Sequence, residues 1–213
     1  MIGVLGGSFD PIHFGHINPL IEVSEQFNLS EIKLIPTYQS AVGKVFHANS
    51  EHRMNMVSII AASSLNNFVA EDLELRKGGV SYTYDTIKLL KERHKNERFC
   101  LIMGLDVFLR IESWYNYKKI LNEVNILVIN RPGFSLNKLD SMDTLIHSKI
   151  SKNKIDFINN NNNYEIYFHE TASINISSSS IREKISKGED PIKKIPGSIM
   201  SYIRRNNLYK KYE

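Results

Sequence analysis

The sequence predicts an α/β fold with a doubly wound, mostly parallel sheet in a single domain. Short apolar runs of strand length alternate with longer stretches of helical periodicity, which is typical of strand–helix–strand crossovers. Two of these runs, at residues 98–103 and 124–129, are almost continuously apolar, as in strands covered on both faces. A chain of 213 residues is within the range of one hydrophobic core, so we expect one domain over residues 1–213.

The first half of the chain contains three predicted strand–helix pairs. Apolar residues Ile17, Leu20 and Ile21 recur near the helical period after the first strand, and Pro36 ends the second strand. The predicted elements are a strand at 2–5, a helix at 15–27, a strand at 32–35, a helix at 51–64, a strand at 68–75 and a helix at 84–94.

The second half of the chain completes the predicted sheet. The two apolar runs belong at its centre, and the segment between them holds helical turns over residues 106–121. Residues 134–163 are rich in Lys, Ser and Asn, and we interpret them as a polar insertion with a weak helix at 139–150 followed by a polar loop. The last predicted elements are a strand at 164–168 and helices at 178–187 and 196–206.

Composition excludes several classes of protein. An apolar fraction of 42% excludes a disordered or collagen-like chain. Cys100 is the only cysteine, so an intramolecular disulfide and a cysteine-based zinc site are excluded, and a reducing, cytoplasmic location is expected. We expect no membrane span, since no long apolar stretch is present, and no nucleic-acid binding, since the net charge of +4 is spread along the chain. No feature of the sequence predicts an oligomeric state.

The segment after the first strand, residues 6–16, has the composition of a phosphate-binding turn. It follows a strand of a parallel sheet, at the edge where α/β proteins bind ligands. Gly6 and Gly7 allow positive φ and a close approach to phosphate, and the amides of the next helix favour negative charge. The turn matches neither GxGxxG nor the GK[ST] ending of a P-loop, which argues against a hydride-transfer enzyme and a Walker-type ATPase.

Two histidines in this turn are candidate catalytic groups. His13 and His16 are three residues apart, which places both imidazoles on one side of the helix start, and Gly15 leaves room for a ligand. Two other interpretations are open. Single histidines often cap helices or pack in cores, and Asp10, His13 and His16 together offer donors suited to a metal ion.

A second candidate phosphate element lies at residues 176–182. Ser178 and Ser179 precede a predicted helix and offer hydroxyl and amide donors, and the guanidinium of Arg182 follows within one turn. These groups suit an anionic ligand. The alternative interpretation is a serine N-cap with a solvated arginine.

The segment GGSFDPIHFGH resembles the signature of the nucleotidyltransferases with the HxGH motif, in the form found in bacterial nicotinate-nucleotide adenylyltransferases. The segment ISSSSIR is similar to the ISSTxIR signature of that family, with Ser179 where threonine is usual. The resemblance implies a Rossmann-like nucleotidyltransferase fold in which His13, His16 and Arg182 are catalytic and contact the phosphates of ATP. It also implies an ATP site that contains Gly6, Gly7, Ser8, Phe9, Ser178 and Ser179.

Two segments between these motifs extend the resemblance. SYTYDT is similar to the SYTxDT segment of the family, which implies that Tyr82 and Thr83 bind the mononucleotide, although a helix N-cap is an alternative. Gly104 and Asp106 are similar to the start of the family's GxDxxxxLxxW motif and imply further ATP contacts. Trp114 closes that motif, which implies stacking on the nicotinate ring, whereas a single tryptophan can also be a core residue.

Three further residues are assigned through the resemblance. Lys44 lies where the family has a PPHK-like segment, without the prolines and histidine, so it is either an ATP ligand or an exposed lysine. Arg131 opens an RPG segment at a strand end and is expected to bind the mononucleotide. Arg53 matches the family's RxxM helix and is expected to serve structure.

The function implied by the resemblance is adenylyl transfer from ATP to nicotinate mononucleotide (NaMN), which forms deamido-NAD and pyrophosphate in NAD biosynthesis. Mg²⁺ bound through the ATP phosphates is the expected cofactor, with no metal ligands from the protein. Three alternatives are open: a pantetheine-phosphate adenylyltransferase, a nucleic-acid-binding domain with a phosphate turn, and a metal-dependent phosphohydrolase.

Overall fold

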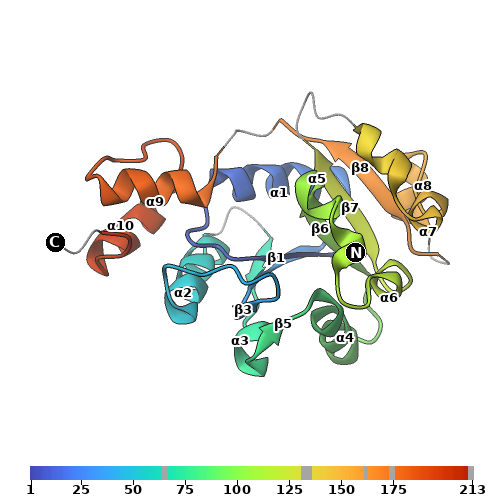
Figure 1. Ribbon diagram of the computed structural model, residues 1–213, viewed down its shortest axis with the longest axis horizontal. Helices are drawn as coiled ribbons and strands as arrows, with labels where there is room; N and C mark the ends of the chain where they lie inside the picture. Colours follow the sequence, from blue (N-terminus) through green and yellow to red (C-terminus); the bar gives the residue numbers. More distant parts are fainter. Residues whose placement is uncertain (64–66, 131–135, 161–162, 173–175, 211–213) are drawn as a thin grey trace.

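The computed structural model has a central six-stranded sheet with helices on both faces (Figure 1). It describes residues 1–63, 67–130, 136–160, 163–172 and 176–210, except for the side chains of residues 136–138. The strands are β1 (Ile2–Gly7), β2 (Glu31–Pro36), β4 (Phe68–Ala70), β6 (Phe99–Gly104), β7 (Asn125–Asn130) and β8 (Ile166–Glu170). Their order is β4-β2-β1-β6-β7-β8, and each neighbouring pair is parallel, which confirms the predicted doubly wound sheet in a single domain.

The strand order reverses direction beside β1. The chain first moves outward from β1 to β2 and β4, then returns to the other side of β1 and moves outward through β6, β7 and β8. β1 pairs with β2 as far as Gly7 and Pro36, but its register with β6 ends at Val4 and Leu101. The two central strands therefore separate toward their carboxyl ends, which is where a ligand crevice is expected in this class of fold.

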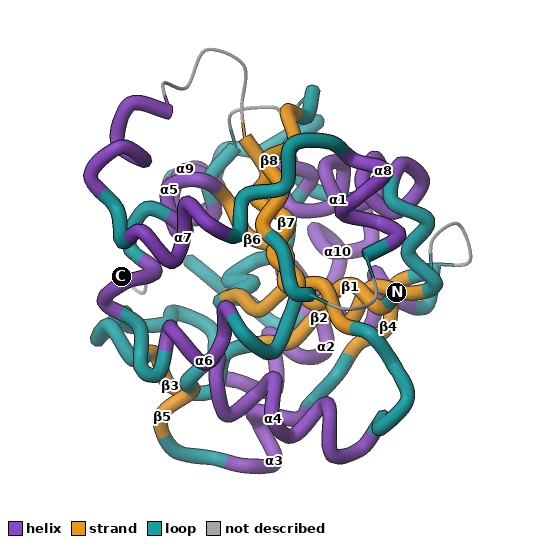
Figure 2. The backbone as a smooth tube through the Cα atoms, turned by 90° about the vertical axis from the view of Figure 1, so that its right-hand side faces the viewer, coloured by secondary structure: helices purple, strands orange, loops and turns teal. Residues whose placement is uncertain are grey.

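Helices cover the two faces of the sheet with separate hydrophobic clusters. The first cluster includes α1 (Phe14–Gln26), α2 (Ser50–Ala61), α8 (Lys154–Asn159), α9 (Ser178–Ser186) and α10 (Gly197–Arg205). The second includes α3 (Leu73–Lys77), α4 (Thr83–Arg93), α5 (Leu105–Phe108), α6 (Tyr117–Leu121) and α7 (Thr144–Ser148). Figure 2 shows the strands between α1 and α8 on one side and α4 and α6 on the other.

The predicted strand at 68–75 is wrong in its second half. The strand β4 ends at Ala70, and α3 begins at Leu73. A helix is favoured here because Asp72 precedes its first turn, basic residues occupy its last turn, and Gly78 ends it with φ of 68°. After α3, β5 (Val80–Ser81) pairs with β3 (Gln39–Ser40) as a second, two-stranded parallel sheet that the sequence did not predict.

The predicted polar segment 134–163 is more ordered than a loop in its described part. The expected weak helix is divided into a 3₁₀ turn, η2 (Leu136–Ser141), and α7, because Asp143 caps α7 by accepting from the amide of Leu145. The expected polar loop contains α8, capped by Asn153. Phe157 of α8 is fully buried against Phe27 and Tyr167, with ring centroids 5.9 and 5.6 Å away. This part of the segment therefore belongs to the core.

The remaining 3₁₀ turn, η1 (Ile111–Ser113), connects α5 to the loop before α6. Within the described ranges, no helix has the length and hydropathy that crossing a bilayer requires.

Candidate active site

A cavity of about 660 Å³ opens at the carboxyl ends of β1 and β6, where the central strands separate. This volume is in the range of small-molecule sites. Six predicted ATP or catalytic residues from the early chain line it: Gly6, Gly7, Ser8, Phe9, His16 and Lys44. Four predicted residues from the middle of the chain also line it: Thr83, Gly104, Asp106 and Trp114. The same crevice thus collects residues predicted for both nucleotides.

The two glycines of the turn matter because they have no side chain, and not because their backbone conformation is unusual. Gly6 and Gly7 belong to β1 and pair with Ile35 and Pro36, so the expected positive φ at these glycines is wrong. A Cβ at Gly6 would meet no atom within 4 Å, and one at Gly7 would lie 3.2 Å from the ring of Phe9. The positive φ, 45°, is found at Phe9 itself. The bare backbone of Gly6 leaves part of the cavity free for a ligand.

His13 and His16 form a stacked pair at the start of α1. Their ring centroids are 3.8 Å apart with an interplanar angle of 29°. His13 is buried at the N-cap position and does not line the cavity, whereas His16 does. Phe9 supports His16 from another side, with its ring edge-on at 5.4 Å. His13 therefore packs against His16 and helps to fix its ring, and His16 is the one of the two that faces the cavity.

His16 is a neutral hydrogen-bond donor in this environment. Burial, and secondarily the charge of Lys44, lower the pKa of His16 from 6.5 to about 4. Its Nδ1 accepts from the backbone N–H of His13 at 3.3 Å. The proton of the neutral ring is then on Nε2, which is available to donate to a ligand oxygen.

Gly15 is required by the close packing around the histidine pair. A Cβ at this position would lie 2.9 Å from both Cε1 and Nδ1 of His13 and 3.2 Å from Cβ of Ile176. Any side chain would displace the imidazole or the segment that leads into α9. The glycine thus permits the contact between the two distant phosphate motifs.

Asp10 is buried, and its carboxylate accepts hydrogen bonds from distant parts of the chain instead of facing a metal site. Its side chain accepts from the amides of His47 and Ala48 at 2.8 and 3.0 Å and from the hydroxyl of Tyr209 at 2.8 Å. Arg182 lies 3.8 Å from its Oδ2. The carboxylate oxygens are occupied by these donors, so the triad Asp10, His13 and His16 suggested for a phosphohydrolase is not formed.

The serine-rich segment contacts the first turn, so the two predicted phosphate elements lie next to each other. Arg182 donates to the backbone oxygen of Asp10 at 2.7 Å, and Ser178 donates to that of Pro11 at 3.0 Å. Ser177 is the N-cap of α9 and accepts from the amide of Ser180, so the capping interpretation holds for the neighbouring serine. Ser178, Ser179 and Arg182 do not line the cavity. Arg182 and Ser178 instead contact the backbone of the turn that does line it.

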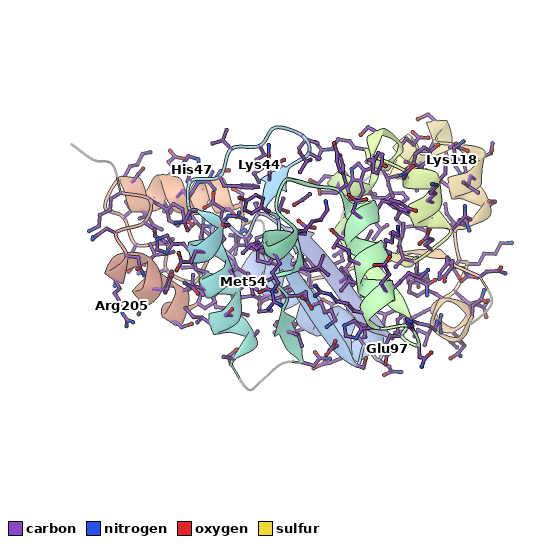
Figure 3. The ribbon with its side chains drawn as sticks, turned by 90° about the horizontal axis from the view of Figure 1, so that it is seen from below. Lys44, His47, Met54, Glu97, Lys118 and Arg205 are labelled. Atoms are coloured by element: carbon purple, nitrogen blue, oxygen red, sulfur yellow. The ribbon has the colours of Figure 1, made fainter. Side chains whose placement is uncertain are left out.

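Lys44 reaches the cavity from the loop between β3 and α2 (Figure 3). Its ammonium group donates to Oγ of Ser8 at 3.0 Å, which places a positive charge at the predicted phosphate position. Arg53 links the turn to the segment before α2: its Nη1 donates to the carbonyl of Ser8 at 3.0 Å, and its Nε donates to the carbonyl of Ala48 at 3.3 Å. Its guanidinium also packs 4.2 Å from the ring centroid of Phe46.

Gly104 and Asp106 form the part of the cavity wall contributed by β6 and α5. Asp106 is exposed in the first turn of α5. A Cβ at Gly104 would lie 2.7 Å from Oδ1 of Asp106, so any side chain at position 104 would force this carboxylate to move.

Of the four residues predicted to bind the mononucleotide, two line the cavity, one does not, and one lies outside the described residues. Thr83, the first residue of α4, and Trp114, just after η1, line the cavity. Tyr82 is the N-cap of α4 and does not; its ring packs on Tyr115 at 4.9 Å. Arg131 lies outside the described residues.

Several polar lining residues were missed by the sequence analysis. They are Thr37, Glu74, Ser81, Thr86 and Asn130. Thr37 and Asn130 stand at strand ends, a position that could have identified them, and Ser81 and Thr86 belong to the SYTYDT segment. Glu74 has no such signal, because the sequence pattern around it predicts a strand where the chain forms α3.

Glu74 is a buried carboxyl that lines the cavity together with Thr83. It is 6% exposed, and Thr86 donates to its Oε1 at 2.7 Å. Burial raises the pKa of Glu74, and hydrogen bonds from Ser81 and Thr86 partly oppose that effect. It links α3 to the first turn of α4.

No group of three or more His, Cys, Asp or Glu side chains that could hold a metal ion is present in the described part of the chain. Glu74 and Asp106 are the acidic residues that line the cavity, and the phosphates of ATP themselves offer oxygen ligands of the kind Mg²⁺ prefers. The residues present therefore fit a metal ion that arrives with ATP.

Known proteins match this chain over nearly its whole length. The family model described as cytidylyltransferase-like matches residues 4–184. A protein of Psychromonas ingrahamii named "Probable nicotinate-nucleotide adenylyltransferase" is 32% identical over 98% of this chain and 97% of its own length. One of the same name from Shewanella baltica is 33% identical over 98% of both chains.

A solved structure of nicotinic acid mononucleotide adenylyltransferase from Plasmodium falciparum, complexed with NaAD, is also similar. It is 27% identical, with a TM-score of 0.74 over 98% of this chain and 96% of that one. The parallel sheet with its reversed strand order, the HxGH turn in the crevice and these relationships agree. The chain belongs to the cytidylyltransferase-like family and, within it, to the nicotinate-nucleotide adenylyltransferases.

Proposed function

We propose that the protein transfers the adenylyl group of ATP to NaMN, forming pyrophosphate and deamido-NAD in NAD biosynthesis. The observation that carries this proposal is the single cavity at the β1–β6 separation. It joins the turn with His16 and Lys44 to the wall with Thr83 and Trp114, so a triphosphate and a pyridine mononucleotide can lie side by side.

The reaction needs no nucleophile from the protein. A phosphate oxygen of NaMN attacks the α-phosphorus of ATP in line, and the bond between that phosphorus and the oxygen bridging to the β-phosphate breaks, so that pyrophosphate leaves. Both reactants are anions, so the protein must hold them together and offset the charge. His16 Nε2–H is preorganised to donate to an α-phosphate oxygen, because its other nitrogen is already fixed by the backbone of His13.

The remaining phosphates would be held by cationic groups near the turn. Lys44 is already in the cavity, and Arg182 would reach the β- and γ-phosphates by a side-chain movement away from the carbonyl of Asp10. His13 supports His16 in this account. Mg²⁺ bound to the ATP phosphates would supply further charge neutralisation.

The other ends of the two nucleotides meet the walls of the cavity. Asp106, beside Gly104, is placed for the hydroxyls of the ATP ribose, and the amides around Gly6 to Phe9 for its phosphates. Trp114 offers a flat face to the pyridine ring, and the polar groups of Thr83 lie beside it. Tyr82 and Arg131 complete the proposed mononucleotide site, Tyr82 by fixing the start of α4.

The test is a reaction with purified protein, ATP, Mg²⁺ and one acceptor at a time: NaMN, nicotinamide mononucleotide or 4′-phosphopantetheine. Pyrophosphate release with NaMN, and a dinucleotide product of the mass of deamido-NAD, are expected. Release with 4′-phosphopantetheine alone would support the related adenylyltransferase instead. Hydrolysis of a phosphate ester without an acceptor, or salt-sensitive binding to an oligonucleotide with no pyrophosphate, would contradict the proposal.

Cys100 is buried and the chain has no other cysteine, which is compatible with the reducing cytoplasm. We place the reaction there as part of the same proposal.

A further inference from the structure

The carboxyl-terminal tail of the chain touches the catalytic turn. Tyr209, four residues after α10 ends, donates its hydroxyl hydrogen to Oδ1 of Asp10 at 2.8 Å across 199 positions of sequence. The backbone bends toward the turn at two left-handed residues, Asn207 with φ of 51° and Tyr209 with φ of 63°. Left-handed backbone is costly for residues other than glycine, so this conformation requires compensating contacts.

The group that Tyr209 contacts is connected to both cationic elements of the phosphate site. Asp10 is 1% exposed, and its carboxylate also accepts from the amides of His47 and Ala48, where the loop carrying Lys44 joins α2. Its backbone oxygen accepts from Arg182 at 2.7 Å. Asp10 thus joins the turn, the Lys44 loop and α9 at one residue.

The hydroxyl of Tyr209 is suited to act as a permanent donor. Burial, and then the negative charge of Asp10, raise the pKa of Tyr209, so the hydroxyl keeps its proton. A buried carboxylate that lost one of its donors would turn toward the remaining ones. The remaining hydrogen-bond donors to the carboxylate are the amides of His47 and Ala48, which follow the Lys44 loop, and Arg182 of α9 lies 3.8 Å from Oδ2. Such a movement would therefore shift the groups proposed to bind phosphate.

We propose that Tyr209 is a positioning residue for ATP: through Asp10, its hydroxyl fixes the Lys44 loop and Arg182 relative to the HxGH turn. The inference rests on the proposed adenylyl transfer. Tyr209 does not touch the cavity and takes no part in the chemistry.

The structure offers a matched control in the same tail unit. The hydroxyl of Tyr202, on α10, also contacts a distant part of the chain: it lies 2.9 Å from Nδ1 of His52 and accepts from Nδ2 of Asn55 at 3.0 Å. Both partners are side chains of α2, and neither is Asp10. Tyr202→Phe removes one hydroxyl from the packing of the same tail and leaves Asp10 unchanged.

The experiment compares Tyr209→Phe with Tyr202→Phe in the full chain. We measure pyrophosphate release against ATP and against NaMN, and titrate α,β-methylene-ATP by calorimetry. For Tyr209→Phe we expect kcat/KM for ATP to fall about tenfold and the analogue to bind several-fold more weakly, because a hydrogen bond to a buried charge is lost. The KM for NaMN should stay within about twofold, and Tyr202→Phe should leave both KM values within about twofold of wild type.

Two results would overturn the inference. One is a Tyr209→Phe protein with unchanged KM for ATP and unchanged analogue binding. The other is a fall in kcat alone that equals the effect of Tyr202→Phe, which indicates only a smaller folded fraction. If Tyr209→Phe does not fold, two other side chains at position 209, 4-aminophenylalanine and 4-fluorophenylalanine, replace it in the comparison. Both fill about the same space as tyrosine, but only 4-aminophenylalanine can donate a hydrogen bond. Equal KM values for ATP in those two proteins would again overturn the inference.

The analogue titration separates this inference from the proposed function. If wild type releases no pyrophosphate with NaMN, the proposed function fails, while weaker binding of the analogue by Tyr209→Phe would still support the positioning role. If wild type reacts and Tyr209→Phe binds the analogue normally, only the positioning role fails.

Discussion

At the scale of single residues, His16 is the group on which we expect turnover to depend most. Its ring is fixed on three sides, by the stack with His13, the edge contact with Phe9 and the hydrogen bond to its Nδ1. A donor held in this way needs no reorganisation when charge develops on the α-phosphate. Because the ring of His16 is buried and neutral, it lacks the positive charge that a more exposed imidazole could carry.

We expect His16→Ala to lower kcat by about 10²- to 10³-fold, the usual effect of removing one preorganised donor. The measurement is pyrophosphate release at saturating ATP and NaMN. His147→Ala, a change at an exposed histidine far along the chain, is the control and should keep wild-type turnover. A folded His16→Ala protein with near-normal kcat would remove His16 from the mechanism.

At the scale of elements, the contact between α3 and α4 fixes the part of the cavity wall that we propose for the mononucleotide. Glu74 of α3 accepts from Thr86 of α4, and both line the cavity beside Thr83. Removal of the carboxyl would leave the Thr86 hydroxyl without this buried partner and free the first turn of α4.

Glu74→Ala should therefore raise the KM for NaMN about tenfold and leave the KM for ATP unchanged. Initial rates with each substrate varied in turn provide the measurement. Glu71→Ala is the matched control, because Glu71 pairs with Lys33 and Arg93 outside the cavity. An equal rise in both KM values after Glu74→Ala would mean that the contact only maintains the fold.

The helix α8 is the element that turns a polar stretch of sequence into part of the core. Phe157→Ala should lower the free energy of unfolding by about 3–5 kcal/mol, the usual cost of deleting a buried phenylalanine. Ile155 of the same helix is 69% exposed, so Ile155→Ala should change it by less than about 0.5 kcal/mol. Urea unfolding monitored by circular dichroism measures both, and equal small effects would show that α8 packs only loosely.

These elements also show how far the sequence could predict the structure. The apolar runs of β6 and β7 identify the sheet centre because burial on both faces is a local property of composition. The α3 helix was missed because apolar residues alternate between Phe68 and Leu75 as in a strand, while its ending at Gly78 is a helix signal. The α8 helix was missed because Phe157 finds its partners, Phe27 and Tyr167, only in the folded chain.

The residues of the candidate site also fall into those with a local signal in the sequence and those that depend on contacts between distant segments. His16 was predicted from the composition of the turn, and Lys44 and Asp106 were assigned through the family resemblance; all three line one cavity. The positive φ at Phe9 and the bond between Asp10 and Tyr209 have no local signal, because each depends on packing between distant segments. That Arg182 meets the backbone of the turn, and not the open cavity, also follows only from the fold.

At the scale of the whole molecule, the pKa of His16 links stability to pH. The folded value of about 4 lies below the ordinary value of 6.5, so between these values the unfolded chain binds more protons. Stability from this group is therefore present above about pH 6.5 and is lost as the pH falls toward 4.

We expect the Tm of the free protein to fall between pH 7 and pH 4.5, and to fall less in His16→Asn, which has no proton to gain. Thermal unfolding followed by circular dichroism across this range measures the difference. His147→Asn should keep the wild-type slope, and identical slopes in all three proteins would contradict the lowered pKa of His16.

The position of β1 in the middle of the sheet has a consequence for biosynthesis on the ribosome. β1 and the turn after it leave the exit tunnel before the other described elements, but one neighbour of β1, β6, begins about a hundred residues later, and another partner of Asp10, Tyr209, follows later still. Contacts of such long sequence separation slow folding. We therefore expect nascent chains to acquire a competent nucleotide site only after Tyr209 has emerged from the ribosome, so that shorter translation products do not compete for ATP.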